Sequence, residues 1–275
     1  MRYCLLLFVS STLFALPTRD STRALYFHDP QDTFNACDPC FLWQDAIRWE
    51  LGYYGNFVFN RNLERRQNVH GLGDVERVSF ATNGGTLTLN IIDWVEFFTM
   101  LGTSKFSICT PARDNQVESE FFFSPRFCWS IGANGVVWKC GDLAFGFSGQ
   151  YFRTMPKIDA FTDLSGGIVT SFNNIEKSTY YEWQAAFTGS YLFGFSNAFE
   201  FVPYISWTAA GAKMGMRGLT FSNNGTIHHI LNMKDKKMWG YALGISGILR
   251  RKASISAEAH FADQKAFFLG ADLAF

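Results

Sequence analysis

In several runs of this chain, bulky apolar residues fall on every second position, and these runs are longer than most strands of soluble proteins. The stretch YEWQAAFTGSYLFGF at 181–195 sets a largely aromatic face against a face of mostly small and polar residues. Alternation with period 2 predicts β-strands whose two faces differ. The same pattern recurs in LAFGFSGQY, WGYALGISGILR, ASISAEAHF and AFFLGADLAF, so we expect a fold built from such strands.

Strand length separates two explanations of this alternation. In a soluble sandwich the apolar face packs on a second sheet, whereas in an outer-membrane barrel it faces lipid and the polar face lines a lumen. A tilted strand needs ~9–11 residues to span a bilayer, against ~5–6 for a typical soluble strand, and the alternating runs here match the longer figure. We therefore expect an all-β, antiparallel transmembrane β-barrel of about 12 strands, within a range of about 10 to 16. An aromatic-cored sandwich is the alternative.

The alternating runs also give approximate strand positions. We expect strands near 43–60, 74–82, 85–98, 119–138 (as one strand or two), 141–153, 178–195, 198–212, 237–250, 252–262 and 266–275, with weaker candidates near 103–110, 164–172 and 213–221. The longer polar connections are expected to be outward-facing loops, near 61–73, 110–118, 154–180 and 221–237.

Composition agrees with a membrane surface and excludes nucleic acid as a partner. The chain contains 30 Phe, 10 Tyr and 8 Trp, and 17% of its residues are charged, against about 25% in typical globular chains. We expect many of these rings to face something other than water or a protein core. Lys+Arg and Asp+Glu number 24 each, so the excess of positive charge that phosphate neutralisation needs is missing.

The first residues predict export. Arg2 precedes the apolar run YCLLLFVSSTLFAL, which has the length of a signal-peptide core and is too short for an ordinary transmembrane helix. We expect a cleaved signal peptide at 1–22 without a clear cleavage motif, an N-terminal segment at 23–42, and the barrel at 43–275. Beyond the signal peptide no apolar run reaches the ~18 residues of a transmembrane helix, so the chain must cross a membrane as strands.

Five cysteines follow the signal peptide: Cys37, Cys40, Cys109, Cys128 and Cys140. Because the number is odd, at least one is free or pairs with another chain in an oxidising compartment. No βαβ pattern surrounds the Cys-x-x-Cys pair, which argues against redox catalysis, and no second pair completes a zinc site. Cys128 and Cys140 flank a predicted hairpin and could lie near one another, but spacing leaves the connectivity open.

The polar faces of the predicted strands supply candidates for the pore lining. These are Arg48, Glu50, Glu182, Gln184, Arg250, Glu258, His260 and Asp272. A wall of mixed charge would give weak ion selectivity, and the inverse phase is unfavourable because Arg or Lys facing mid-membrane lipid costs ~2–4 kcal/mol. The alternative is that these residues lie near strand ends and face water or loops.

Nothing in the sequence predicts catalysis, a metal site or a cofactor. No nucleophile elbow, phosphate loop or HExxH motif is present. Ser256 and His260 share a strand face, which leaves an outer-membrane hydrolase as a minor alternative. The adjacent His228 and His229 would point apart in a strand, and we expect them in a loop without a metal role.

A longer motif begins at the cysteine pair. It combines CDPC, W-x-DAI and GYYG-x-FVF-x-R, carried by Cys37, Asp38, Pro39, Cys40, Trp43, Asp45, Ala46, Ile47, Gly52, Tyr53, Tyr54, Gly55, Phe57, Val58, Phe59 and Arg61. With two further blocks, at 131–158 and 181–207, the chain resembles the chlamydial major outer membrane protein family of porins. It is shorter than the main porin of that family, so we expect a smaller paralogue or a divergent relative.

The resemblance carries functional expectations. It implies a barrel in the outer membrane of a Gram-negative-type bacterium, in contact with outer-membrane lipid, that lets small hydrophilic solutes diffuse passively. It also implies homotrimers and disulfide links to cysteine-rich envelope proteins. The alternative function is a structural envelope protein whose barrel anchors such crosslinks and conducts little.

Overall fold

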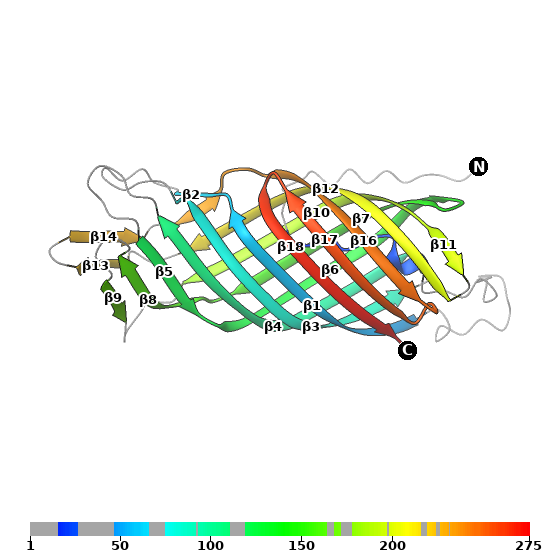
Figure 1. The fold of residues 1–275 in the computed structure, drawn as a ribbon, viewed down its shortest axis with the longest axis horizontal. Coiled ribbons are helices and arrows are strands. Elements are labelled where there is room, and N and C mark those ends of the chain that lie inside the picture. The colour runs from blue at the N-terminus through cyan, green and yellow to red at the C-terminus, as the bar shows by residue number, and fades with distance from the viewer. Residues whose placement is uncertain are drawn as a thin grey trace.

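The computed structural model describes residues 16–26, 47–65, 75–91, 93–110, 119–163, 168–171, 178–196, 198–215, 219–223, 226–230 and 232–275. Within these residues, 10 long antiparallel strands form the wall of a barrel (Figure 1). In chain order they are β1 (Ile47–Arg61), β3 (Arg77–Ile91), β4 (Val95–Thr110), β6 (Arg126–Cys140), β7 (Leu143–Thr154), β10 (Thr179–Tyr191), β12 (Phe199–Gly215), β16 (Trp239–Leu249), β17 (Ala253–Phe261) and β18 (Gln264–Ala274).

The first and last strands close the barrel. β1 pairs with β3 on one side and with β18 on the other, from Glu50 opposite Ala274 to Arg61 opposite Gln264. Closure gives the backbone donors and acceptors of every wall strand a partner, as a bilayer demands. The predicted antiparallel transmembrane barrel is confirmed, and its 10 wall strands fall within the expected range but below the expected 12.

One strand too many was predicted because a glycine-containing stretch was taken for a turn. The Asn83-Gly84-Gly85 stretch, expected to separate strands at 74–82 and 85–98, lies inside β3, and the chain turns at Asp93 and Trp94 instead. Strands β3 and β4 approach closely here, because a Cβ atom on Gly84 would lie 2.5 Å from the Leu101 carbonyl oxygen. The weaker candidate at 103–110 is the second half of β4, whereas the candidate at 213–221 includes the end of β12 and the start of β13.

Shorter strands extend the wall at one end. β5 (Ser119–Ser124) pairs with β4 and with β8 (Lys157–Asp163), and β8 pairs with β9 (Ile168–Ser171). Pro125 separates β5 from β6 and Pro156 separates β7 from β8, as expected of a residue that cannot donate to a strand ladder. The remaining short strands are β2 (Leu63–Arg65), β11 (Phe193–Ser196), β13 (Leu219–Asn223), β14 (Thr226–Ile230) and β15 (Met233–Asp235).

The two ends of the barrel differ. Tight turns at 93–94, 141–142 and 250–252 lie at the end that also holds the C-terminus. The four predicted outward loops join strand ends at the opposite end, on the left of Figure 1. They are not all loop, however. The 154–180 connection contains β8 and β9, and the 221–237 connection contains β14 and β15, so His228 and His229 lie in a strand and not in a loop.

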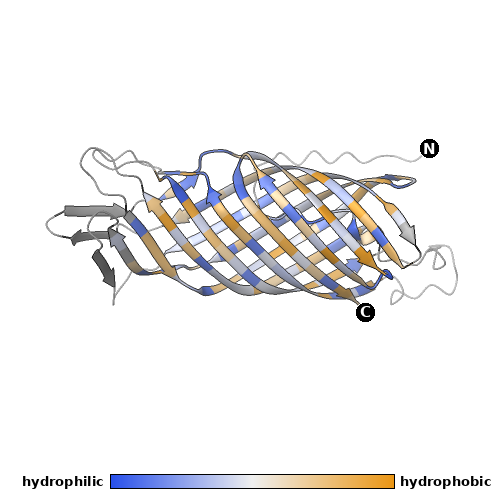
Figure 2. Ribbon diagram, in the orientation of Figure 1, coloured by the Kyte–Doolittle hydropathy of each residue, from blue (hydrophilic) through white to orange (hydrophobic). Residues whose placement is uncertain are grey.

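The faces of the wall strands follow the predicted phase. Along β1, Trp49, Leu51 and Tyr53 are exposed on the outside, whereas Glu50 and Tyr54 are buried inside. Figure 2 shows apolar and polar residues alternating along the other strands in the same way. Large apolar side chains therefore cover the outer surface, as lipid contact requires. No helix among the described residues is long and apolar enough to cross a bilayer.

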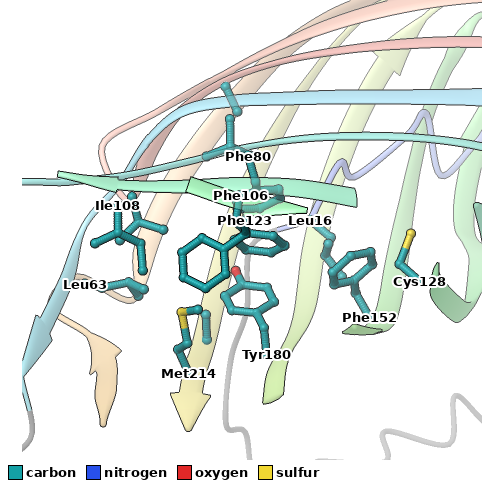
Figure 3. Close-up of a cluster of buried hydrophobic side chains, with 14 of the residues drawn as sticks. Leu16, Leu63, Phe80, Phe106, Ile108, Phe123, Cys128, Phe152, Tyr180 and Met214 are labelled. Carbon is teal, nitrogen blue, oxygen red and sulfur yellow. The ribbon is translucent and has the colours of Figure 1, made fainter. Parts of the chain in front are cut away.

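Aromatic side chains fill the inside of the barrel near the end with the long connections (Figure 3). The rings of Phe80 and Phe106 stack with centroids 4.7 Å apart, and the Tyr180 ring lies 4.9 Å from that of Phe106. Leu16, Phe123 and Phe152 join the same buried cluster. This part of the interior is packed as a hydrophobic core and not open as a channel.

Candidate functional site in the barrel lumen

An N-terminal segment lies inside the barrel. Residues 16–24 are buried, and the short 3-10 helix η1 (Arg23–Tyr26) follows within the same segment (blue in Figure 1). The sequence predicts that residues up to 22 belong to a cleaved signal peptide. The barrel wall meets this segment with polar side chains, so contacts between the two form the candidate site.

Arg23 binds a group of three carboxylates. Its guanidinium donates through Nη1 to Asp272 of β18 and through Nη2 to Oε2 of Glu50 of β1, at 2.6 Å. Oε1 of Glu96, from β4, lies 3.8 Å from Nη2. All four side chains are at most 3% exposed. Buried charges of this kind are stable only when they are paired and hydrogen-bonded.

Arg19 lies beside this group in an aromatic environment. Its guanidinium carbon is 5.2 Å from the Phe98 ring centroid, 5.8 Å from that of Tyr54 and 6.0 Å from that of Phe268. Its Nη1 atom is 3.9 Å from Asp272. These distances are those of cation–π contacts. Arg19 has a φ of 49°, a left-handed conformation that residues other than glycine rarely adopt, so tertiary contacts must hold it there.

Thr18 attaches the segment to a second carboxylate. Its backbone N–H donates to Oε1 of Glu258 at 2.8 Å, and its hydroxyl donates to Oε2 at 2.6 Å. Tyr204 also donates to Oε2 at 2.9 Å, and Nε2 of His260 contacts Oε1. Glu258 therefore anchors the segment by binding Thr18, which lies 240 positions before it in the sequence.

A third charged group lies toward the end with the long connections. The fully buried Arg61 places Nη2 2.9 Å from Asp235 and 3.6 Å from Glu182, and Nη1 3.3 Å from Asp263. Tyr180 donates to Glu182. This group uses no residue of the N-terminal segment, so it belongs to the barrel wall and its loops.

The predicted lining residues do not all share one environment. Six are buried inside the barrel: Glu50, Glu182, Gln184, Glu258, His260 and Asp272. Arg48 is half-buried near the start of β1. Arg250 is exposed in the 250–252 turn, where its φ is 47°, so it lies outside the strand to which the sequence assigned it.

Sequence reasoning missed several members of these groups. Glu96 carried a usable signal, because it alternates with the outward-facing Val95 and Phe97. Arg19 and Arg23 carried none, since they fall in or beside the predicted signal peptide. Asp235 ends the short strand β15 and Asp263 lies in the turn between β17 and β18, so long-range alternation did not predict the direction of either side chain.

The structure separates the two cysteines that were expected near one another. Cys128 and Cys140 lie at opposite ends of the single strand β6 and do not flank a hairpin. Twelve residues of extended strand place them ~40 Å apart, so a bond between them is ruled out. Cys128 is buried and Cys140 is exposed, and neither forms a disulfide within the described residues. Cys109 is buried, and Cys37 and Cys40 lie outside the described residues.

The Ser256 and His260 pair is also too far apart for catalysis. The two residues lie four positions apart on β17, which is ~13 Å along a strand. A nucleophile and its base need a hydrogen bond of about 3 Å, and His260 instead contacts Glu258. Within the described residues no group of three His, Cys, Asp or Glu side chains is placed to hold a metal ion.

The chain is similar in sequence to the major outer membrane porins of Chlamydia. The model of the family described as Chlamydia major outer membrane protein matches residues 10–72 and 113–174. The major outer membrane porin of Chlamydia trachomatis serovar F is 29% identical, in a match that covers 63% of this chain and 63% of that porin. The serovar D porin is 24% identical, covering 87% of this chain and 88% of the porin. The porin of Chlamydia abortus is 25% identical, with the same coverage.

These alignments also show the difference in size. The alignment with the serovar D porin runs over 351 positions although this chain has 275 residues, so that porin contains segments with no counterpart here. Among solved structures, the β domain of the Bordetella autotransporter BrkA matches with a TM-score of 0.45 and 10% identity, covering 84% of this chain and 100% of that one. The protease OmpT of Escherichia coli matches with a TM-score of 0.39 and 10% identity, covering 83% and 96%.

The quoted motifs, the family match and the porin relatives agree with one another. The chain forms an outer-membrane β-barrel that is similar to the major outer membrane porins of Chlamydia, at 24–29% identity.

Proposed function

We propose that this chain is a porin through which small hydrophilic solutes and ions diffuse, which requires that the N-terminal segment leaves the lumen and that the aromatic cluster around Phe106 and Tyr180 opens. The observation that carries the proposal is a closed wall with an apolar outer surface and buried charged side chains inside, among them Glu50, Glu258 and Asp272. A barrel that served only as an anchor would not need such a lining. The porin names of the relatives support the same function.

Cleavage of the signal peptide would change the contents of the lumen. Cleavage of a signal peptide after residue 22 would remove Thr18 and Arg19 from the lumen and leave Arg23 at the new N-terminus. The mass of the protein isolated from outer membranes identifies this N-terminus. A mature chain that still begins before residue 16 would contradict the proposed cleavage and leave the segment as a permanent plug.

Planar-bilayer recording tests the porin function. The protein is purified from outer membranes, and its folding is verified by the change in gel mobility on heating. We expect stepwise conductance in potassium chloride and passage of small neutral sugars into liposomes. A folded barrel that shows neither would contradict the proposal.

A second function, a structural envelope protein crosslinked through disulfides, is favoured by the packed interior and by Cys140. This cysteine is exposed at the end of the barrel with short turns, which is the periplasmic end in outer-membrane barrels. On non-reducing gels of envelopes we expect a crosslinked band that Cys140→Ser weakens and the buried control Cys128→Ser retains. Cys37 and Cys40 stay candidates for the same role.

Assembly and catalysis complete the proposal. We expect homotrimers, which native mass spectrometry of the detergent-solubilised protein would detect. We expect no enzymatic activity, because the names of the relatives describe porins and not enzymes. In addition, Ser256 and His260 lie four positions apart along β17, too far apart for a nucleophile and its base.

A further inference from the structure

The N-terminal segment contacts the lumen in the way that a bound peptide contacts a receptor. Thr18 binds Glu258, Arg19 lies among aromatic rings, Thr22 is hydrogen-bonded to Ser190 at 2.6 Å, and Arg23 binds Glu50 and Asp272. Within the segment, the Thr22 backbone and hydroxyl both donate to Asp20, at 3.0 and 2.6 Å. Side chains from several separate strands therefore recognise a short segment with arginines four positions apart.

The two arginines occupy subsites of different chemistry. The Arg23 subsite is a group of carboxylates, Glu50, Glu96 and Asp272, whose oxygens meet two different nitrogens of the guanidinium. The Arg19 subsite is formed by the rings of Tyr54, Phe98 and Phe268, with Asp272 at its edge. A planar, forked cation fits both subsites, because guanidinium binds carboxylates through several N–H groups and stacks on aromatic faces.

The carboxylate subsite requires a cation. Without Arg23, three buried carboxylates would face one another, which is unfavourable for all of them. Oε1 of Glu50 and Oε1 of Glu96 accept no hydrogen bond among the described residues, although both side chains are at most 1% exposed. These oxygens have acceptor capacity for a further N–H donor.

We propose that the lumen contains a two-subsite binding site for guanidinium-bearing cations, such as arginine-containing peptides, which residues 18–23 occupy in the structure. The inference rests on the proposed porin function in one respect: ligands reach the site through the lumen. When the segment is removed or displaced, an external cation of this class takes the place of Arg23 and Arg19 and partly blocks the channel.

Binding is tested separately from conductance. The full-length chain with Arg19→Gln and Arg23→Gln is refolded in detergent and titrated by calorimetry with the nonapeptide LPTRDSTRA, which corresponds to residues 16–24. We expect this peptide to bind about tenfold or more tightly than the same peptide with both arginines replaced by glutamine. Adding Asp272→Asn to the protein should abolish the preference. The control Glu200→Gln, which removes a carboxylate paired with Arg251 outside the site, should retain it.

If the double variant does not refold, the single variant Arg23→Gln replaces it and methylguanidinium replaces the peptide. Binding is then expected in Arg23→Gln and should be lost when Glu50→Gln is added. Equal affinity for the arginine and glutamine peptides, or methylguanidinium binding that survives Glu50→Gln, would overturn the proposed site. Because calorimetry needs no current, a barrel that binds these cations but never conducts would contradict the porin function and leave the site standing.

Discussion

At the scale of single residues, the barrel interior balances buried charges in groups. Arg61 faces Glu182, Asp235 and Asp263, and the N-terminal segment supplies Arg23 to a separate group of carboxylates. Alternation predicted that Glu50, Glu182 and Glu258 share the inner phase of their strands, but not what neutralises them. The partners come from distant parts of the sequence, and local periodicity contains no information about such contacts.

Arg61→Met should destabilise the barrel strongly. Three carboxylates would lose their shared cation in a buried environment, and breaking a buried ion pair costs about 3–5 kcal/mol. Urea unfolding in lipid vesicles measures this difference. The matched control is Lys234→Gln, which removes an exposed pair with Glu64 at 3.0 Å and should cost no more than ~1 kcal/mol. Equal losses in both variants would contradict the assigned role of Arg61.

At the scale of elements, glycines and prolines define how the strands run. Asn83-Gly84-Gly85 suggested a turn because glycine often marks one, yet these residues lie within a strand that needs close contact with its neighbour. Pro125 and Pro156, in contrast, do interrupt strands, since proline lacks the donor that a ladder needs. The glycine stretch was therefore wrongly read as a turn, and the expected strand region 119–138 is interrupted at Pro125.

Gly102→Ala should therefore impair folding. A Cβ atom at this position would lie 2.2 Å from the Asn83 carbonyl oxygen, in the backbone of the paired strand. Overpacking of this kind typically costs about 1–3 kcal/mol. The folded fraction on unheated gels after refolding measures the effect. Gly194→Ala is the control, because a Cβ atom there meets nothing within 4 Å, and it should fold like the unmodified chain.

At the scale of the whole molecule, the apolar outer surface makes the barrel a membrane protein. Ile131, Ile205 and Trp207 are each more than half exposed, on strands that lie on different parts of the wall. A soluble protein rarely exposes so continuous an apolar surface. The sandwich alternative is therefore wrong, because the apolar face covers the outside of a closed barrel and does not pack on a second sheet.

Leu101→Arg should destabilise the barrel in a bilayer. This side chain is 56% exposed on the outer face near the middle of β4, where a positive charge facing lipid costs about 2–4 kcal/mol. The free energy of unfolding from vesicles gives the size of the loss. Trp94→Arg, in the turn that precedes β4, should cost only ~0–1 kcal/mol because it lies near the interface. Equal costs would contradict the assigned membrane position of β4.

The linear pattern of residues was enough to predict an all-β membrane barrel and the facing of most strands, because side-chain direction in a strand depends only on position parity. It was not enough to predict the 10-strand closure or the occupant of the lumen. Closure depends on which strands become neighbours, as when β1 pairs with β18 at the other end of the chain. The lumen contacts depend on folding as well, since Thr18 meets Glu258 only when the wall brings positions 240 residues apart together.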